Sequence, residues 1–265
     1  MSFLSAYLRL NQRRRFKIYV TLICYVFFLF MSMKVVSQPL PTITVAMYIE
    51  PPFSNIVDGK FVGENIDIAN ALAEKLSREV RFIYCPPARC FAFLQNGQAD
   101  MMIAIRKTEI REQFLNYLEP PIKIQHLPLQ FYIRAESKIE LNRYQDLQPL
   151  KVGVLRGASY FDKFDHDTQL TKIPLTNYQQ LVDMLLKGRI DTFLEREETI
   201  TPWVDQKIYK TKIKLAKFSY DETVGSYIVV SKRSPLRNEI AHLSKALKAI
   251  SDNGEIQTIL NKVRN

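Results

Sequence analysis

The sequence predicts an α/β fold built from two lobes. Patterns typical of strands and of helices alternate along the chain in two separate series, residues 42–105 and residues 151–194. Such alternation is typical of parallel sheets covered by helices. The chain has 265 residues, which is enough for one or two domains. The two series therefore indicate two α/β lobes.

The first series contains three strands and two helices. Residues 66–76 place apolar side chains three or four positions apart, the spacing of a helix that packs on a sheet. Short β-branched and aromatic runs mark the strands. We expect strands at 42–49, 80–84 and 100–105, and helices at 66–76 and 89–94.

The second series begins with a strand at 151–155. A helix at 178–187 follows, which Gly188 ends, and a strand at 191–194 comes next. Near the C-terminus, residues 236–250 place apolar side chains on one face, so we expect a helix that packs against a lobe.

The first 37 residues form a segment of their own. Five basic residues between Arg9 and Lys17 precede an apolar run from Ile18 to Met33, and small residues follow at 35 and 37. This order is typical of a secretory signal peptide, here residues 1–37. The alternative is an uncleaved anchor, although this run of 16 residues is shorter than the ~20 of a typical spanning helix. We expect an exported protein that meets the membrane only through this segment.

Charge and cysteines exclude two classes of function. Without residues 1–37, the chain keeps 31 basic and 27 acidic residues, a net charge of +4 with no arginine-rich stripe, so no nucleic-acid partner is expected. Cys85 and Cys90 are the two cysteines of this part, and an oxidising compartment favours a disulfide between them. The three histidines are scattered, so neither a metal site nor a cofactor is expected.

Three segments carry a resemblance to a known family. They are Pro51-Pro52-Phe53, residues 63–68 (GENIDI) and residues 99–111 (ADMMIAIRKTEIR). Their order and spacing resemble family 3 of the bacterial extracellular solute-binding proteins. The resemblance implies a type II periplasmic-binding-protein-like clamshell with two crossover hinge strands, at 127–133 and 224–230. It also implies that lobe 1 comprises 38–130 and 226–265, and lobe 2 comprises 131–225.

The resemblance implies a ligand site centred on Arg111. In the family, an arginine three positions after a threonine, here Thr108, grips a carboxylate of the ligand, and a planar guanidinium suits this task. Arg106 stands at a strand end where the family has a small residue, and Phe53 is expected to line the cleft. The structural alternatives are an N-cap for Thr108, a solvated or paired cation for Arg106, and a core position for Phe53.

In the second lobe, Gly157 and Ser159 belong to a turn that resembles the one closing over the ligand, although such residues are also common in ordinary turns. Glu195 and Arg196 mark a departure. The amino-acid binders have an aspartate for the ligand's ammonium where this chain has Arg196. Either Glu195 substitutes for it, the ligand is not an ordinary α-amino acid, or both residues form an exposed charge pair.

The resemblance implies a periplasmic protein of a Gram-negative bacterium that captures a small polar solute, amino-acid-like or anionic, by closure of its lobes. Its expected partner is an ABC permease, or a membrane sensor if the protein is a signalling input, and its expected state is a monomer. No catalytic residue is expected. The competing hypothesis is an enzyme on the same scaffold, similar to cyclohexadienyl dehydratases, with Glu50 or Glu195 as acid or base.

Overall fold

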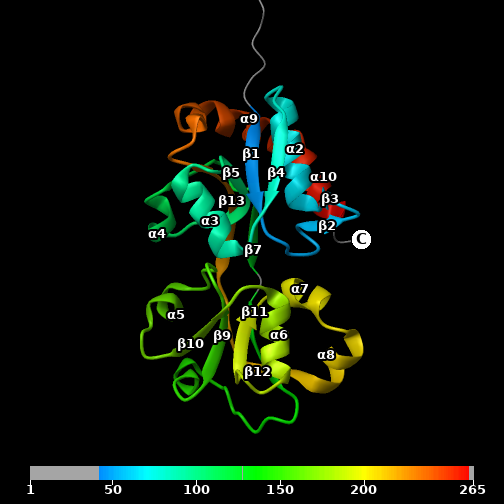
Figure 1. Cartoon of the computed structure of the whole chain (residues 1–265), viewed down its shortest axis with the longest axis vertical. Helices are drawn as coiled ribbons and strands as arrows, with labels where there is room; N and C mark the ends of the chain where they lie inside the picture. The colour runs from blue at the N-terminus through cyan, green and yellow to red at the C-terminus, as the bar shows by residue number, and fades with distance from the viewer. Residues whose placement is uncertain (1–41, 127, 263–265) are drawn as a thin grey trace, which may run out of the picture. The chain divides into compact units, whose positions relative to one another are not determined.

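The computed structural model describes residues 42–126 and 128–262. The predicted signal peptide lies outside them. Within these residues, no helix combines the length and the apolar character needed to cross a membrane. The described residues form two sheets with their own helices, which we call lobe 1 (residues 42–126 and 223–262) and lobe 2 (residues 129–220) (Figure 1).

The sheet of lobe 1 has the strand order β4-β1-β5-β13-β6, and β7 also pairs with β13. The first three strands along the sheet run parallel, whereas β13 runs antiparallel to β5, β6 and β7. A separate hairpin joins β2 and β3. The bounds of these strands are Ile43–Met47 (β1), Asn55–Val57 (β2), Lys60–Val62 (β3), Val80–Tyr84 (β4), Met101–Arg106 (β5), Leu115–Tyr117 (β6), Lys123–His126 (β7) and Thr223–Ser231 (β13).

Helices cover the sheet of lobe 1 because each has one apolar face. In α2 (Glu64–Lys75), Ile68 and Leu72 are fully buried, and in α9 (Ile240–Asp252) Leu243 and Leu247 are. These side chains share one core with β1, β5 and β13. The remaining helices of this lobe are α3 (Pro87–Asn96), the short α4 (Glu109–Glu112) and α10 (Glu255–Lys262), and a 3₁₀ turn spans Pro235–Glu239.

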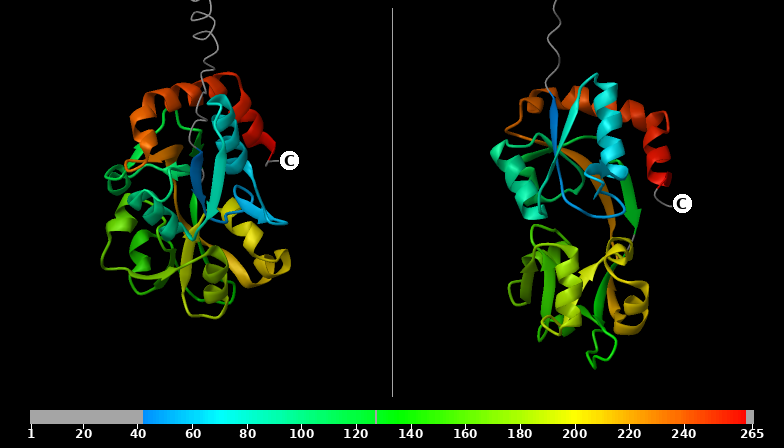
Figure 2. Two further views of the ribbon diagram at one scale, coloured as in Figure 1. Left: turned by 45° about the horizontal axis from the view of Figure 1, so that its top comes forward. Right: turned by 45° about the vertical axis from the view of Figure 1, so that its right-hand side comes forward.

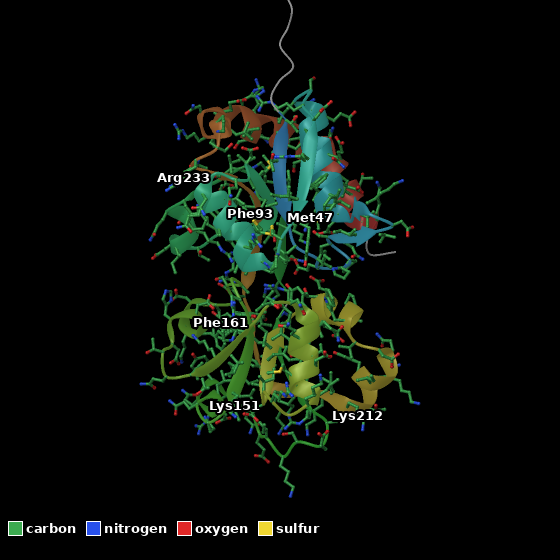
Figure 3. The ribbon with its side chains drawn as sticks, in the orientation of Figure 1. Met47, Phe93, Lys151, Phe161, Lys212 and Arg233 are labelled. Atoms are coloured by element: carbon green, nitrogen blue, oxygen red, sulfur yellow. A yellow bond between two sulfur atoms is a disulfide. The ribbon has the colours of Figure 1, made fainter. Side chains whose placement is uncertain are left out.

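The sheet of lobe 2 has the strand order β10-β9-β11-β8-β12. Its middle strands are buried, and α6 packs its apolar face on them through Leu181 and Leu185. Figure 3 shows Phe161, another core side chain, in this lobe, and Met47 in lobe 1. The bounds are Leu129–Arg134 (β8), Lys151–Leu155 (β9), Asp162–His166 (α5), Thr171–Leu175 (β10), Tyr178–Leu186 (α6), Thr192–Glu195 (β11), Glu197–Ile200 (α7), Gln206–Lys212 (α8) and Ile213–Tyr220 (β12).

Both sheets are mixed: each contains the expected parallel strands and also antiparallel ones. The reason is the crossing of the chain between the lobes. The chain leaves lobe 1 after β7 and returns from β12 into β13, and each crossing strand therefore runs against its neighbours. Figure 2 lets the reader follow both crossings from two sides. We propose lobe boundaries between His126 and Leu129 and between Tyr220 and Thr223, a few residues before the positions expected from the sequence.

The predicted disulfide is confirmed. Cys85 and Cys90 are bonded, with their Cα atoms 5.3 Å apart, and both side chains are buried. The bridge ties the end of β4 to the first turn of α3. Pro87 begins this helix, and Gly97 ends it in the left-handed conformation, with φ of 74°. The disulfide thus fixes a helix whose N-terminal end borders the candidate site described below.

Candidate functional site

A cavity of about 120 Å³ is lined by residues of both lobes. The C-terminal ends of β1, β5, β9 and β11 supply or precede many of these residues, and strand C-termini are the usual ligand sites of open α/β sheets. A larger groove of about 690 Å³ adjoins the cavity and shares Arg111, Gly157 and Tyr160 with it. The enclosed cavity is small compared with the ~300 Å³ of ordinary ligand pockets, so it suits a small solute or one end of a longer one.

Arg111 is held in place by backbone groups. Thr108 caps α4, and its hydroxyl oxygen accepts a hydrogen bond of 3.3 Å from the Arg111 amide. The guanidinium donates from Nη1 to the Arg106 carbonyl and from Nη2 to the Gly157 carbonyl in lobe 2, both at 3.0 Å. Burial lowers the pKa of Arg111, but a guanidinium remains a cation at neutral pH. Among the residues that the structure describes, no carboxylate forms an ion pair with Arg111, and its positive charge faces the cavity.

An aromatic ring also supports this guanidinium. Phe91 lies below Arg111, with the guanidinium carbon 4.2 Å from the ring centroid. Phe91 was not among the binding residues predicted from the sequence. Pro87 and Phe91 are four residues apart in α3, share one helix face and both line the cavity. The helical spacing was the signal that could have found Phe91.

Gly157 brings lobe 2 close to α3 of lobe 1. Its φ is +88°, and a Cβ atom added there would lie 2.8 Å from the Ala88 Cα atom. Only a glycine fits both the left-handed backbone and this approach. The turn after β9 thus brings its carbonyl within reach of Arg111.

Glu195 ends β11 with a buried carboxylate. Only 6% of the residue is exposed, and Oε1 accepts one hydrogen bond, 2.9 Å, from the backbone amide of Arg196. Burial raises the pKa of Glu195 to about 7, whereas the positive charge of Arg196 acts in the opposite direction. A protonated and an ionised form are therefore both accessible near neutral pH.

Glu50 is a second carboxylate at the cavity, and it comes from lobe 1. The hydroxyl of Tyr178, at the start of α6, donates a hydrogen bond of 3.1 Å to Oε1. Burial raises the pKa of Glu50, and the hydroxyls of Tyr178 and Tyr48 oppose this shift. Both tyrosines have a raised pKa because they are buried, so both stay protonated at neutral pH. The sequence analysis noted Glu50 but did not include it among the binding residues.

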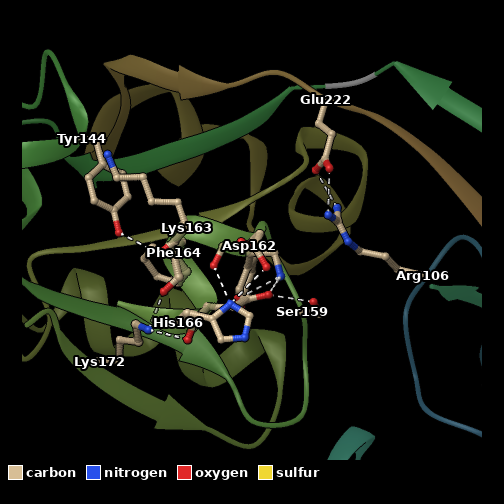
Figure 4. Close-up of polar contacts among 11 residues, drawn as sticks. Arg106, Tyr144, Ser159, Asp162, Lys163, Phe164, His166, Lys172 and Glu222 are labelled. Carbon is tan, nitrogen blue, oxygen red and sulfur yellow. Dashed lines mark hydrogen bonds and ion pairs between the residues drawn. The ribbon is translucent and has the colours of Figure 1, made fainter. Parts of the chain in front are cut away.

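Two predicted site residues are already engaged by carboxylates. Arg106 donates two hydrogen bonds to Glu222, at 2.8 and 2.9 Å, so its charge is neutralised at the chain crossing (Figure 4). Ser159 donates its hydroxyl proton to Asp165 at 2.7 Å. Arg106 is thus a paired cation, one of the alternatives considered from the sequence, and its partner is 116 residues away.

Residues 43–264 match the bacterial extracellular solute-binding proteins, family 3. The chain belongs to this family. No curated protein sequence matches the chain significantly. Among solved structures, an ancestral arginine-binding protein bound to arginine is 22% identical with a TM-score of 0.71, over 86% of this chain and 100% of that one. A Salmonella typhimurium periplasmic binding protein with high arginine specificity is 20% identical with a TM-score of 0.68, over 84% and 99%.

A third solved structure, the arginine-, lysine-, histidine-binding protein ArtJ of Geobacillus stearothermophilus, is 18% identical with a TM-score of 0.69, over 84% of this chain and 94% of that one. The predicted two-lobed α/β fold of family 3 solute-binding proteins is thereby confirmed. At these identities the structures bear on the fold alone, and the binding residues of this chain stay a prediction.

Seven of the eight predicted binding residues line the cavity of this family 3 protein. Thr108 does not line it, because its side chain caps α4, as the structural alternative had it. Among the described residues, no group of three His, Cys, Asp or Glu side chains is placed to hold a metal ion. The seven residues are Phe53, Arg106, Arg111, Gly157, Ser159, Glu195 and Arg196.

Proposed function

We propose that this chain is a periplasmic binding protein that captures a small amino-acid-like solute between its lobes and delivers it to an ABC importer. The observation that supports the proposal is the pairing of opposite charges across one cavity: Arg111 from lobe 1 and Glu195 from lobe 2. A carboxylate of the solute binds the Arg111 guanidinium, which forms strong bidentate pairs with carboxylates. A protonated nitrogen of the solute binds Glu195, the carboxylate next to the position of the family's aspartate, which Arg196 occupies.

We expect the solute to favour closure of the lobes because it adds contacts that form only when both lobes touch it. Two contacts within the protein already join the lobes. Gln125 of β7 donates a hydrogen bond of 3.2 Å to Glu198 of α7, and Tyr178 donates to Glu50. All four residues of these contacts line the cavity. A solute that bridges Arg111 and Glu195 adds a further link between the lobes.

The experiment is a thermal-shift screen of the protein purified from the periplasm of a bacterial host that expresses the full chain. The screen covers amino acids, dicarboxylates, polyamines and aromatic acids. A solute at 100 times its dissociation constant stabilises the fold by about 2.7 kcal/mol, which raises the melting temperature by roughly 5 to 10 °C. The proposal predicts such a shift with amino acids, and the absence of any shift contradicts it. Intact mass reports whether the purified chain begins at residue 38.

A second candidate function is acid catalysis, and one observation favours it. A general acid works best when its pKa lies near the operating pH, and Glu195 has a pKa of about 7 inside the cavity. The corresponding enzyme would resemble a cyclohexadienyl dehydratase. Product formation from prephenate or arogenate by the purified protein supports this candidate, whereas saturable binding without product excludes it for these substrates.

A further inference from the structure

Two carboxylates from opposite lobes, Glu50 and Glu195, border the cavity, and neither forms an ion pair with a cation in residues 42–126 or 128–262. Glu195 accepts one backbone hydrogen bond at Oε1, and no hydrogen bond within the described residues reaches its Oε2. Glu50 accepts from the Tyr178 hydroxyl, which also interacts with the charge of Glu195. Tyr178 therefore connects Glu50 of lobe 1 to lobe 2 at the cavity.

The cations that line the cavity from lobe 1 interact with groups other than Glu50 and Glu195. Lys123 of β7 is paired with Glu64 at 2.7 Å and lies over the Phe53 ring, 4.5 Å from its centroid. Arg106 of β5 is paired with Glu222. Arg111 of α4 donates to two carbonyl groups. None of these cations forms an ion pair with Glu50 or Glu195 within the described residues.

On the lobe 2 side, one cation is close to both carboxylates. The Arg196 side chain lowers the pKa of Glu50 and of Glu195, but no ion pair joins it to either one within the described residues, and its buried Nε has no hydrogen-bond partner there. Glu198 of α7 adds a third negative charge, which accepts from Gln125. The other titratable neighbour from this lobe, Tyr160, is buried and protonated.

We propose that Glu50 and Glu195 form a two-carboxylate cage that binds one protonated nitrogen group of the solute, an ammonium or a guanidinium. This inference rests on the proposed function and adds to it the charge of the solute. Glu50, Glu195 and Glu198 line the cavity, whereas Arg111 and Arg196 are the lining cations that form no ion pair within the described residues. In their ionised forms the three carboxylates therefore exceed these two cations by one charge, and a cation between Glu50 and Glu195 balances it. A guanidinium suits the cage well because it presents several N–H donors in one plane. The solute is therefore a cationic amino acid, with its carboxylate at Arg111 and its side-chain cation in the cage, so that Glu195 binds the side-chain nitrogen group.

The cage couples binding of the solute to release of protons. Below pH 7, Glu195 is mostly protonated in the empty cavity, and the carboxyl of Glu50 is also shifted toward its protonated form. A bound cation favours the ionised form of both groups. By linkage, affinity for a cationic solute rises by up to about tenfold per pH unit below pH 7 for each proton that is released. Above pH 8 this dependence disappears.

The test is calorimetric titration of the purified protein with L-arginine and with L-citrulline, at pH 6 and pH 8. The two probes have nearly the same shape, but only arginine has a charged side chain. At pH 8 we expect arginine to bind at least about tenfold more tightly, since a hydrogen bond to a charged group contributes 1.5 to 3 kcal/mol. At pH 6 we expect a smaller ratio of the dissociation constants of citrulline and arginine. Titrations in two buffers of different ionisation enthalpy report the protons released.

Substitution of either carboxylate tests whether the preference for arginine and the release of protons arise from the cage. Glu50→Gln and Glu195→Gln each reduce the preference for arginine over citrulline at pH 8 by about tenfold or more and abolish part of the proton release. Glu197→Gln is the matched control, because it removes the same charge from an exposed glutamate outside the cavity and leaves the preference unchanged.

Two results overturn the inference and are distinguishable from a failure of the proposed function. If both probes bind with equal affinity at pH 8 and without proton release, the cage is wrong and solute capture stands. If L-glutamate binds but L-arginine does not, the cavity prefers an anion and the cage is again wrong. If no amino acid binds, the proposed function fails together with the cage.

Discussion

The guanidinium of Arg111 and the carbonyl group of Gly157 are joined by a hydrogen bond of 3.0 Å that connects the two lobes. Arg111 precedes the first crossing between the lobes, and Gly157 lies in the turn after β9. The residue proposed to hold the solute thus also touches the lobe that closes over it. Substitution of a single residue in such a contact should therefore change solute binding measurably.

Gly157→Ala is expected to weaken solute binding. The added methyl group meets the Ala88 Cα atom at 2.8 Å, so the turn has to move away from α3 and the Arg111 contact opens. The positive φ adds a strain of about 1 kcal/mol to the folded state. Gly254→Ala is the matched control, because its φ of +81° imposes the same strain with no atom within 4 Å. Urea unfolding and calorimetric titration separate the two effects, and equal affinities of the two variants contradict the prediction.

Glu195→Gln is expected to stabilise the solute-free protein at pH 8 more than at pH 5. The pKa of Glu195 is raised from 4.5 to about 7 in the folded state, so the folded chain holds a proton that the unfolded chain has already released. The contribution of Glu195 to the free energy of unfolding therefore falls as pH rises from about 4.5 to 7 and stays low above pH 7. Glutamine does not titrate. The gain at pH 8 should exceed the gain at pH 5 by roughly 2 to 3 kcal/mol.

Urea unfolding at the two pH values measures this difference. Glu197→Gln serves as the control, since Glu197 is exposed. A gain that is the same at pH 5 and pH 8 would show that the carboxyl of Glu195 titrates as in the unfolded chain, and the account of its burial would be wrong.

Arg106 and Glu222 are expected to stabilise the fold as a pair and not to supply charge to the solute site. Their side chains are 19% and 34% exposed, so we expect a coupling energy of about 1 kcal/mol. A double-mutant cycle with Arg106→Gln and Glu222→Gln, followed by urea unfolding, measures it. Additive effects of the two substitutions would contradict the pairing.

The disulfide is expected to contribute about 2 kcal/mol to stability, because the loop between Cys85 and Cys90 is short. Cys85→Ser together with Cys90→Ser should therefore lower the melting temperature by roughly 4 to 8 °C. Intact mass after denaturation in iodoacetamide without a reductant checks the bond itself. Alkylation of these two cysteines under such conditions would show that the purified protein lacks the bridge.

The local pattern of the sequence predicted individual strands and helices well. Strand β4 (Val80–Tyr84) and strand β9 (Lys151–Leu155) have the predicted bounds, since short apolar runs between turn residues mark buried strands. The direction of β13 was not predictable from such runs, because it depends on where the chain returns from lobe 2. Periodicity describes which face of an element is apolar and says nothing of its neighbours in the sheet.

The same limit applies to the site. The resemblance to the family pointed to Arg111, Gly157 and Glu195, because they follow motifs that are local in the sequence. The hydrogen-bond partners of other charged side chains at the cavity lie far away in the sequence. Glu222 lies 116 residues from Arg106, and Tyr178 lies 128 residues from Glu50. A single sequence contains no signal for such pairs, and only the folded chain brings them together.

The measurement that tests the central claim most directly is calorimetric titration of wild type, Arg111→Ala and Arg89→Ala with the amino acid that gives the largest thermal shift. Arg89 is an exposed arginine of α3 that packs on Phe93, so it controls for the loss of a guanidinium. We predict that Arg111→Ala raises the dissociation constant by about 100-fold or more, as removal of one partner of a buried charge pair does. Arg89→Ala should bind like wild type. Equal affinities of wild type and Arg111→Ala would contradict the assignment of this cavity as the solute site.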